Sequence, residues 1–194
     1  MGGVLMGDYF DELKKAMQLL AQDERVLFIG QAVAYKGTAF FKTLEGIPDS
    51  MRIELPVFEE VQMGISIGLG LEGFIPVSFF PRMDFMMLAM NQLVNHLDKM
   101  EEMSSGQFKP KVIIRTSIGS VKPLFPGPQH SQDHTQALRL MLKNVNVVKL
   151  ERKEDVIPEY QKALLSEKST IVIEIPDLYH TDAPGGFEGI PGSK

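Results

Sequence analysis

Two adjacent carboxylates, Glu59 and Glu60, stand near the start of the apolar, glycine-dotted segment 56–73. A carboxyl group at the edge of a buried apolar segment holds its proton more strongly than one in water, so it can donate a hydrogen bond to a ligand. The other interpretation is that both side chains only complement the positive end of a helix dipole. The segment alone is compatible with an acid–base site and with a simple helix end.

A second candidate is His130, in the stretch GPQHSQDHTQ at 127–136. Ser131 or Asp133 can cap the helix that follows, which would place His130 just before a helix N-terminus and facing the preceding loop. A histidine there can transfer protons near neutral pH, although a surface histidine beside a cap is the plainer alternative. His134 lies four residues on, but no third ligand accompanies the pair, so we predict no metal site.

Composition limits the class of protein. The chain has 194 residues, is 44% apolar and 23% charged, and carries a net charge of −5. One globular domain is expected, and the lack of a long basic run argues against nucleic acid or an anionic membrane as partner. The absence of cysteine excludes thiolate chemistry. No stretch reaches the roughly 18 apolar residues of a membrane span, and we expect a cytoplasmic protein.

Short apolar runs alternate with amphipathic ones along the chain, which predicts an α/β fold with three layers. In it a mainly parallel central sheet of about six strands is covered by helices on both faces. The domain is expected over residues 1–175, followed by an extended tail over 176–194. The predicted strands are 26–30, 51–55, 75–80, 111–116, 145–150 and 170–175, and the predicted helices are 8–22, 58–73, 84–100, 131–142 and 155–166.

Two features of this pattern suggest contact with another chain. Gly64 and Gly68 lie one helical turn apart, and each mid-helix glycine costs roughly 1 kcal/mol relative to alanine. We expect another helix, from a second subunit, to approach them closely. The amides of Asn91, Gln92 and Asn95 within an apolar helix indicate either a subunit contact or a buried hydrogen-bond network.

Four stretches in this order resemble one family: EEVQMG after a proline-terminated strand, NQLVN at 91–95, SSGQFKPKVIIRT at 104–116 and GPQHSQ at 127–132. Together they resemble the pyrimidine-binding domain of the transketolase and 2-oxo acid dehydrogenase β-subunit family, above all the pyruvate dehydrogenase and branched-chain type. The resemblance covers residues 8–175. It implies that Glu59 hydrogen-bonds the aminopyrimidine of thiamine diphosphate, with Glu60 as a neighbour, and that His130 lies near the reactive carbon.

At the expected cofactor site the chain departs from the family pattern. Arg82 stands where an aromatic residue usually sandwiches the pyrimidine, so Phe85 or Phe80 is expected to take that place. These three residues and Glu59 are the expected cofactor-binding set. The chain lacks the Gly-Asp-Gly signature of the domain that binds Mg²⁺ and diphosphate.

The implied protein is one subunit of a two-chain enzyme for 2-oxo acid decarboxylation, dehydrogenation or ketol transfer. It would be inactive without an α-type subunit that holds Mg²⁺, and the assembly would be a homodimer or heterotetramer. The alternative is a non-catalytic interaction or regulatory protein that retains the fold.

Overall fold

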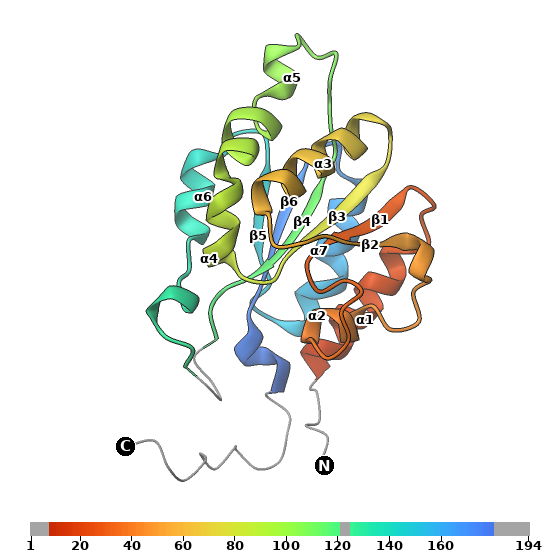
Figure 1. Ribbon diagram of the computed structural model, residues 1–194, viewed down its shortest axis with the longest axis vertical. Helices are drawn as coiled ribbons and strands as arrows, with labels where there is room; N and C mark the ends of the chain where they lie inside the picture. Colours follow the sequence, from red (N-terminus) through yellow and green to blue (C-terminus); the bar gives the residue numbers. More distant parts are fainter. Residues whose placement is uncertain (1–7, 121–124, 181–194) are drawn as a thin grey trace.

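A computed structural model of the chain describes residues 8–120 and 125–180 (Figure 1). Its centre is a six-stranded sheet in the order β2-β1-β3-β4-β6-β5, and every neighbouring pair is parallel. The strands are β1 (Val26–Gly30), β2 (Arg52–Glu54), β3 (Ile75–Phe80), β4 (Ile113–Ser117), β5 (Asn146–Lys149) and β6 (Thr170–Glu174). The predicted α/β fold is therefore confirmed.

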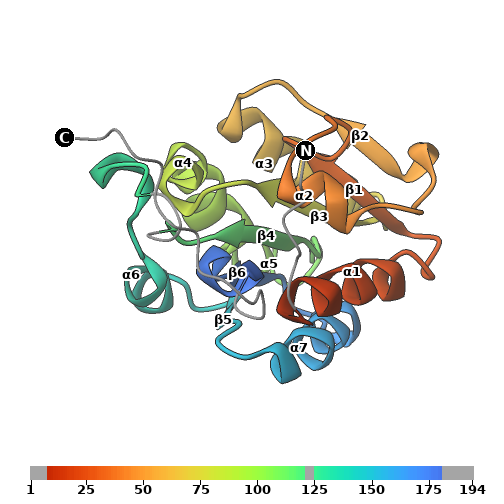
Figure 2. The ribbon, with the colours of Figure 1, turned by 90° about the horizontal axis from the view of Figure 1, so that it is seen from below.

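Helices cover both faces of the sheet, as the view along the layers shows (Figure 2). On one face α1 (Asp8–Leu20) packs beside α7 (Lys153–Leu165), with the short α2 (Ala39–Thr43) next to α1. On the other face lie α3 (Glu59–Leu71), α4 (Met83–Met86) and α6 (Thr135–Met141). Because both faces are covered, the central strands β3, β4 and β6 are buried along their whole length, and β3 and β6 carry mostly apolar residues.

The predicted helix 84–100 is the element that differs most from expectation. After α4 the chain forms a 3₁₀ turn, η2 (Met87–Ala89), a π-helix, η3 (Asn91–Leu97), and a last short helix, α5 (Met100–Met103). Wider i→i+5 turns of this kind are frequent at functional sites. Asn91 and Asn95 are exposed and bond each other at 3.0 Å, so the predicted buried network is wrong for this pair.

The packed unit extends past residue 175. A 3₁₀ turn, η5 (Pro176–His180), follows β6, and Tyr179 within it is only 5% exposed. Tyr179 stacks on Tyr9 and donates a 2.5 Å hydrogen bond to Glu174, which holds the turn against the core. The expected tail therefore begins with an ordered turn, and residues 181–194 lie outside the described residues.

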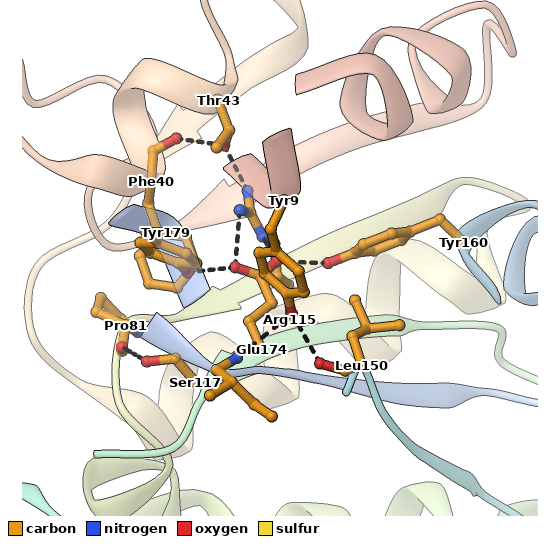
Figure 3. Close-up of polar contacts among 11 residues, drawn as sticks. Tyr9, Phe40, Thr43, Pro81, Arg115, Ser117, Leu150, Tyr160, Glu174 and Tyr179 are labelled. Carbon is orange, nitrogen blue, oxygen red and sulfur yellow. Dashed lines mark hydrogen bonds and ion pairs between the residues drawn. The ribbon is translucent and has the colours of Figure 1, made fainter. Parts of the chain in front are cut away.

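A buried ion pair joins two central strands (Figure 3). Arg115 on β4 and Glu174 at the end of β6 are both fully buried, and the guanidinium donates to both carboxylate oxygens at 2.5 and 3.1 Å. The guanidinium also lies 4.6 Å from the ring centre of Phe40 and 4.7 Å from that of Phe79. Phe40 and Phe79 belong to the core on the α1 face, so this charge pair is part of the core itself.

Within the described part of the chain, no helix is both long and apolar enough to cross a membrane.

Candidate functional site

The candidate site lies at the point where the order of the strands in the sheet reverses. From β1 the chain moves outward to the edge strand β2, then crosses back to pair β3 on the other side of β1 and continues to β4. In parallel α/β sheets, ligands bind outside the carboxyl ends of strands at such a switch point. The loops that follow β1, β3 and β4 therefore surround the expected location, and the segment after β2 leads directly into α3.

Glu59 is the first residue of α3 and is only 3% exposed. Its Oε1 accepts a 3.1 Å hydrogen bond from Nε2 of Gln31, the residue that follows β1. Its other oxygen, Oε2, accepts none from the described residues and is not among their fully buried unpartnered atoms. One oxygen of the carboxyl group is thus held by the protein, and the other is available to a ligand.

Glu60, the neighbour, has a different environment. Its side chain is exposed, and its Oε1 accepts a long, 3.4 Å hydrogen bond from Nε2 of Gln92 on η3. An exposed carboxylate at a helix N-terminus is what the dipole interpretation predicts. The structure therefore separates the two adjacent glutamates into a buried one and a solvated one.

A buried polar cluster fixes α3 to β3 just beyond Glu59. Nε2 of Gln62 donates to the Phe79 carbonyl at 2.8 Å and to Ser78 Oγ at 3.1 Å, while Ser66 Oγ donates to the Gln62 carbonyl at 2.8 Å. Gln62 is fully buried, and its Oε1 has no hydrogen-bond partner among the described residues. These contacts hold the first two turns of α3, and so the position of Glu59, against the sheet.

The second part of the site brings together three of the predicted residues. Nη1 of Arg82 donates to the His130 backbone carbonyl at 3.2 Å. The rings of Phe85 and His130 meet edge to face, with 5.1 Å between their centres and 79° between their planes. Phe85 is 38% exposed, so its ring can still accept a stacked ligand. Phe80 differs, because it is 1% exposed and belongs to the core on the α3 face.

The loop that carries His130 is fastened to α4 on the C-terminal side of the histidine. Asp84 Oδ1 accepts hydrogen bonds from the backbone and side-chain nitrogens of Gln132 at 3.2 and 2.9 Å. Gly127 has a φ of +96°, a conformation that suits glycine, at the start of the turn η4 (Pro128–His130). A β-carbon on Gly119 would lie 1.9 Å from the Ser131 backbone, so only glycine allows the chain after β4 to pass this close to the loop.

The expected cap of α6 is present in a modified form. Asp133, rather than Ser131, accepts from the backbone of Thr135, at 2.9 Å, and its other oxygen pairs with Lys149 at 2.7 Å. Desolvation opposes the charge of Asp133, but the bonds from Lys149 and Thr135 prevail and lower its pKa to about 2. The carboxylate is therefore charged throughout the physiological range and fixes the end of the histidine loop.

The described residues do not bring Glu59 and His130 into direct contact, since no hydrogen bond or ring contact joins them. Their hydrogen-bond partners nevertheless follow two paired strands. Gln31, which bonds Glu59, follows β1, and Arg82, which bonds the His130 backbone, lies after β3. Sequence reasoning missed Gln31 and Asp84. The position of Gln31 directly after a strand that ends in glycine was the signal that could have indicated it. In the described part of the chain, no three His, Asp or Glu side chains form a metal-binding group.

No protein-family model matches the chain. Among curated proteins it is 29% identical over 166 residues to the 3-methyl-2-oxobutanoate dehydrogenase subunit beta of Mycobacterium tuberculosis (83% of this chain, 46% of that protein). It is 28% identical over 184 residues to the mitochondrial pyruvate dehydrogenase E1 component subunit beta of Caenorhabditis elegans (92% and 51%). The chain spans about half the length of these curated relatives.

Solved structures show the same fold. A split-gene transketolase, described as an inactive β4 tetramer, superposes with a TM-score of 0.65 at 18% identity, over 85% of this chain and 50% of that one. Transketolase from Campylobacter jejuni gives a TM-score of 0.68 at 16% identity, over 85% and 25%. The homologues are thus 2-oxo acid dehydrogenase β subunits and the structural neighbours transketolases, which confirms the resemblance noted in the sequence.

Proposed function

We propose that the chain is one subunit of a two-chain, thiamine-diphosphate-dependent enzyme that acts on 2-oxo acids, and that Glu59 is its pyrimidine-side glutamate. The observation that carries the proposal is the carboxyl group of Glu59. It is almost fully buried at the switch point of the sheet, with one oxygen held by Gln31 and the other open. In the family that the chain resembles, a glutamate on this helix hydrogen-bonds the ring nitrogen of the aminopyrimidine.

The residues present fit the pyrimidine half of the cofactor. Glu59 offers a carboxyl oxygen without a protein partner among the described residues, and Phe85 offers a partly exposed aromatic face beside His130. Arg82 lies at the same edge, and its planar guanidinium can stack on a ring in place of the usual aromatic residue. When bound, thiamine diphosphate supplies the nucleophilic carbon that attacks the carbonyl group of the substrate.

In this role Glu59 donates a hydrogen bond from Oε2 to a ring nitrogen of the pyrimidine and moves a proton there. Its burial matters because hydrogen bonds to a positioned carboxyl group are stronger where water is excluded. His130 would assist proton transfer near the substrate or orient the substrate. The hydrogen bond from Arg82 to the His130 carbonyl fixes the backbone from which the imidazole extends. Phe80 stays a prediction, and its burial in the core makes it the least accessible of the proposed set.

A partner subunit is part of the proposal. The relatives carry the name subunit beta, and one structural neighbour is an inactive β4 tetramer of a split-gene transketolase. We infer that an α-type subunit supplies the groups for Mg²⁺ and diphosphate, in a heterotetramer or around a homodimer of this chain. The cytoplasmic location also stays a prediction, since two relatives are named as mitochondrial proteins.

The outer face of α3 supports association with a second subunit. Apart from the backbone of α3 itself, no atom of the described residues lies within 4 Å of a β-carbon placed on Gly64 or Gly68. Large apolar side chains on and near the same helix are exposed, namely Val57, Phe58, Val61, Ile65 and Leu71. The glycine with a close backbone neighbour inside the chain is instead Gly70, whose β-carbon would lie 3.0 Å from the Lys111 nitrogen. The close approach expected at Gly64 and Gly68 would therefore come from another chain.

The test is a matched pair of variants in the enzyme reconstituted with its partner subunit. Glu59→Gln should reduce thiamine-diphosphate-dependent turnover of pyruvate and 3-methyl-2-oxobutanoate by about a hundredfold or more, as expected for loss of a positioned acid–base group. Glu60→Gln shares the helix end but is solvated, and should leave turnover within about twofold. Size-exclusion chromatography checks that both variants still bind the partner.

Equal and small effects of the two substitutions would refute the role of Glu59. A partner-bound complex that turns over neither 2-oxo acids nor ketol donors, in the unsubstituted form, would favour the alternative of a non-catalytic interaction or regulatory protein.

A further inference from the structure

The contact between Gln31 and Glu59 has features of a built support. Nε2 of Gln31 lies 3.1 Å from Oε1 of Glu59, although the two residues are 28 positions apart. It is the one hydrogen bond to this carboxyl group from the described residues, and it comes from the loop after β1. A nearly buried carboxyl group has few partners that can orient it, so this single donor determines the orientation of the Glu59 carboxyl group.

The backbone on both sides of Gln31 is fixed by the sheet. Gly30 has a φ of +129°, and a β-carbon there would lie 2.5 Å from Gln62 Nε2 and 2.6 Å from the Phe79 carbonyl oxygen. The Gly30 carbonyl accepts from the Leu55 backbone at 2.8 Å, and the Gln31 nitrogen donates to the Phe79 carbonyl at 3.4 Å. Gln31 therefore leaves β1 in a direction that neighbouring strands dictate.

The loop beyond Gln31 is held by a carboxylate of the protein itself. Glu54, at the end of β2, accepts hydrogen bonds from the backbone nitrogens of Ala32, Val33 and Ala34 at 2.8, 2.8 and 2.6 Å. Ala32 has a φ of +62°, an uncommon conformation for a non-glycine residue. Successive backbone N–H groups of this kind form an anion-binding concavity. Here Glu54 fills it, so the loop needs no external ligand to be ordered.

The chemistry of the amide determines what the support does. The Nε2 group of glutamine can only donate, and it does not ionise. Oε1 of Glu59 is therefore committed as an acceptor, and a proton on the carboxyl group belongs on Oε2. We propose that Gln31 is the positioning residue for Glu59, and that Glu54 acts through Gln31 by fixing its loop. This inference rests on the proposed function, because it assigns Oε2 as the oxygen that faces the pyrimidine.

The chain contains a matched control for this contact. Gln92 donates to Glu60 as Gln31 donates to Glu59, but at 3.4 Å and on the surface. The variants are Gln31→Met and Gln92→Met, which remove each amide with little change of side-chain length. A third variant, Glu54→Gln, removes the charge that holds the loop and leaves Gln31 in place. Circular dichroism and thermal unfolding establish that each variant folds.

The first readout uses the full chain alone, without cofactor. In protein labelled with ¹³C at the glutamate side-chain carboxyl groups, Glu59→Gln and Glu60→Gln assign the two resonances. Gln31→Met should move the Glu59 resonance and leave that of Glu60, and Gln92→Met should leave that of Glu59. An unmoved Glu59 resonance in Gln31→Met would overturn the inference at this stage.

The second readout uses the enzyme reconstituted with its partner, with pyruvate as substrate. Gln31→Met should lower kcat about tenfold or more, with KM unchanged, because a misplaced reactive group loses rate and not substrate affinity. Gln92→Met should have no effect. Glu54→Gln should lower kcat less, and should add nothing in the Gln31→Met background, since residues that act through one another are not additive.

These outcomes separate the inference from the proposed function. Loss of turnover in Glu59→Gln together with full turnover in Gln31→Met overturns the role of Gln31 and leaves that of Glu59. Full turnover in Glu59→Gln overturns both. Additive effects of Glu54→Gln and Gln31→Met would overturn the part assigned to Glu54.

Discussion

Two glutamates of the described residues are buried near the carboxyl ends of the strands, and their surroundings are opposite. Glu174 is completely enclosed and receives hydrogen bonds from Arg115, Tyr160 and Tyr179 on both of its oxygens. Glu59 is almost as buried but receives one, from an uncharged amide. No cation pairs with Glu59 within the described residues.

A structural carboxylate and a functional one differ in how many of their oxygen lone pairs the protein itself occupies with hydrogen bonds. A buried charge that is fully paired and hydrogen-bonded is compatible with a stable core, and removing one partner leaves the other uncompensated. A buried carboxyl group with one oxygen unused by the protein is costly unless a ligand completes it. Glu174 should thus matter for folding, and Glu59 for chemistry.

The largest effect on stability is expected from Arg115→Met. It leaves the Glu174 carboxylate buried without its cation, which typically costs about 3–5 kcal/mol of unfolding free energy. Denaturation with urea measures this on the full chain. The double variant Arg115→Met/Glu174→Met should be less destabilised than Arg115→Met alone, because no unpaired charge remains. A loss of unfolding free energy below about 1 kcal/mol for Arg115→Met would contradict the structural role of Glu174 that distinguishes it from Glu59.

A smaller loss, about 1–3 kcal/mol, is expected from Tyr179→Phe, which removes one hydrogen bond to the Glu174 carboxylate. Burial, and then the charge of Glu174, raise the pKa of Tyr179 well above its ordinary value of 10.0. The folded protein therefore keeps this proton above pH 10 while the unfolded chain releases it, so stability falls as pH rises from there.

The phenylalanine variant lacks this proton, and its stability should fall less steeply in alkaline solution. Urea denaturation of both proteins at neutral pH and above pH 10 compares the two slopes. Tyr160 has the same kind of bond to Glu174, at 2.9 Å, and its burial raises its pKa as well, so the alkaline loss should shrink but not vanish. Equal slopes would place Tyr179 outside the network.

The contrast between the two glutamates also marks what the sequence could predict. The runs Val26–Gly30 and Ile75–Phe80 were predicted with the bounds they have, because each is short, apolar and bounded by turn residues or a charged segment. The pair Glu59 and Glu60 was singled out by its place at the start of an apolar helix, and the family resemblance implied that Glu59 is the functional one. Helix 84–100 was predicted unbroken, because the wider turns of η3 arise from packing and leave no local signal.

The polar contacts escaped prediction for a related reason. Arg115 reads as an odd charge in a buried strand until Glu174, 59 residues away, is placed beside it. Gln31 reads as a loop residue until β1 and α3 are placed together. The local sequence pattern carries no information on such pairs, because they can be identified only once the strand order is known. The identity of a candidate carboxylate was therefore predictable, and its partners were not.

The smallest effect is expected on the stability of Glu59→Gln in the chain alone. Glutamine keeps the shape of the side chain and an oxygen that can accept from Gln31, and no cation among the described residues loses an ion-pair partner. The unfolding free energy should change by less than about 1 kcal/mol, in either direction. Glu174→Gln, the matched substitution, should cost several times more, because it leaves the Arg115 guanidinium unpaired in the core. Thermal unfolding of the two variants side by side measures the difference. Similar losses would mean that the protein holds Glu59 as a structural group, as it holds Glu174, and would contradict a ligand-binding role for Oε2.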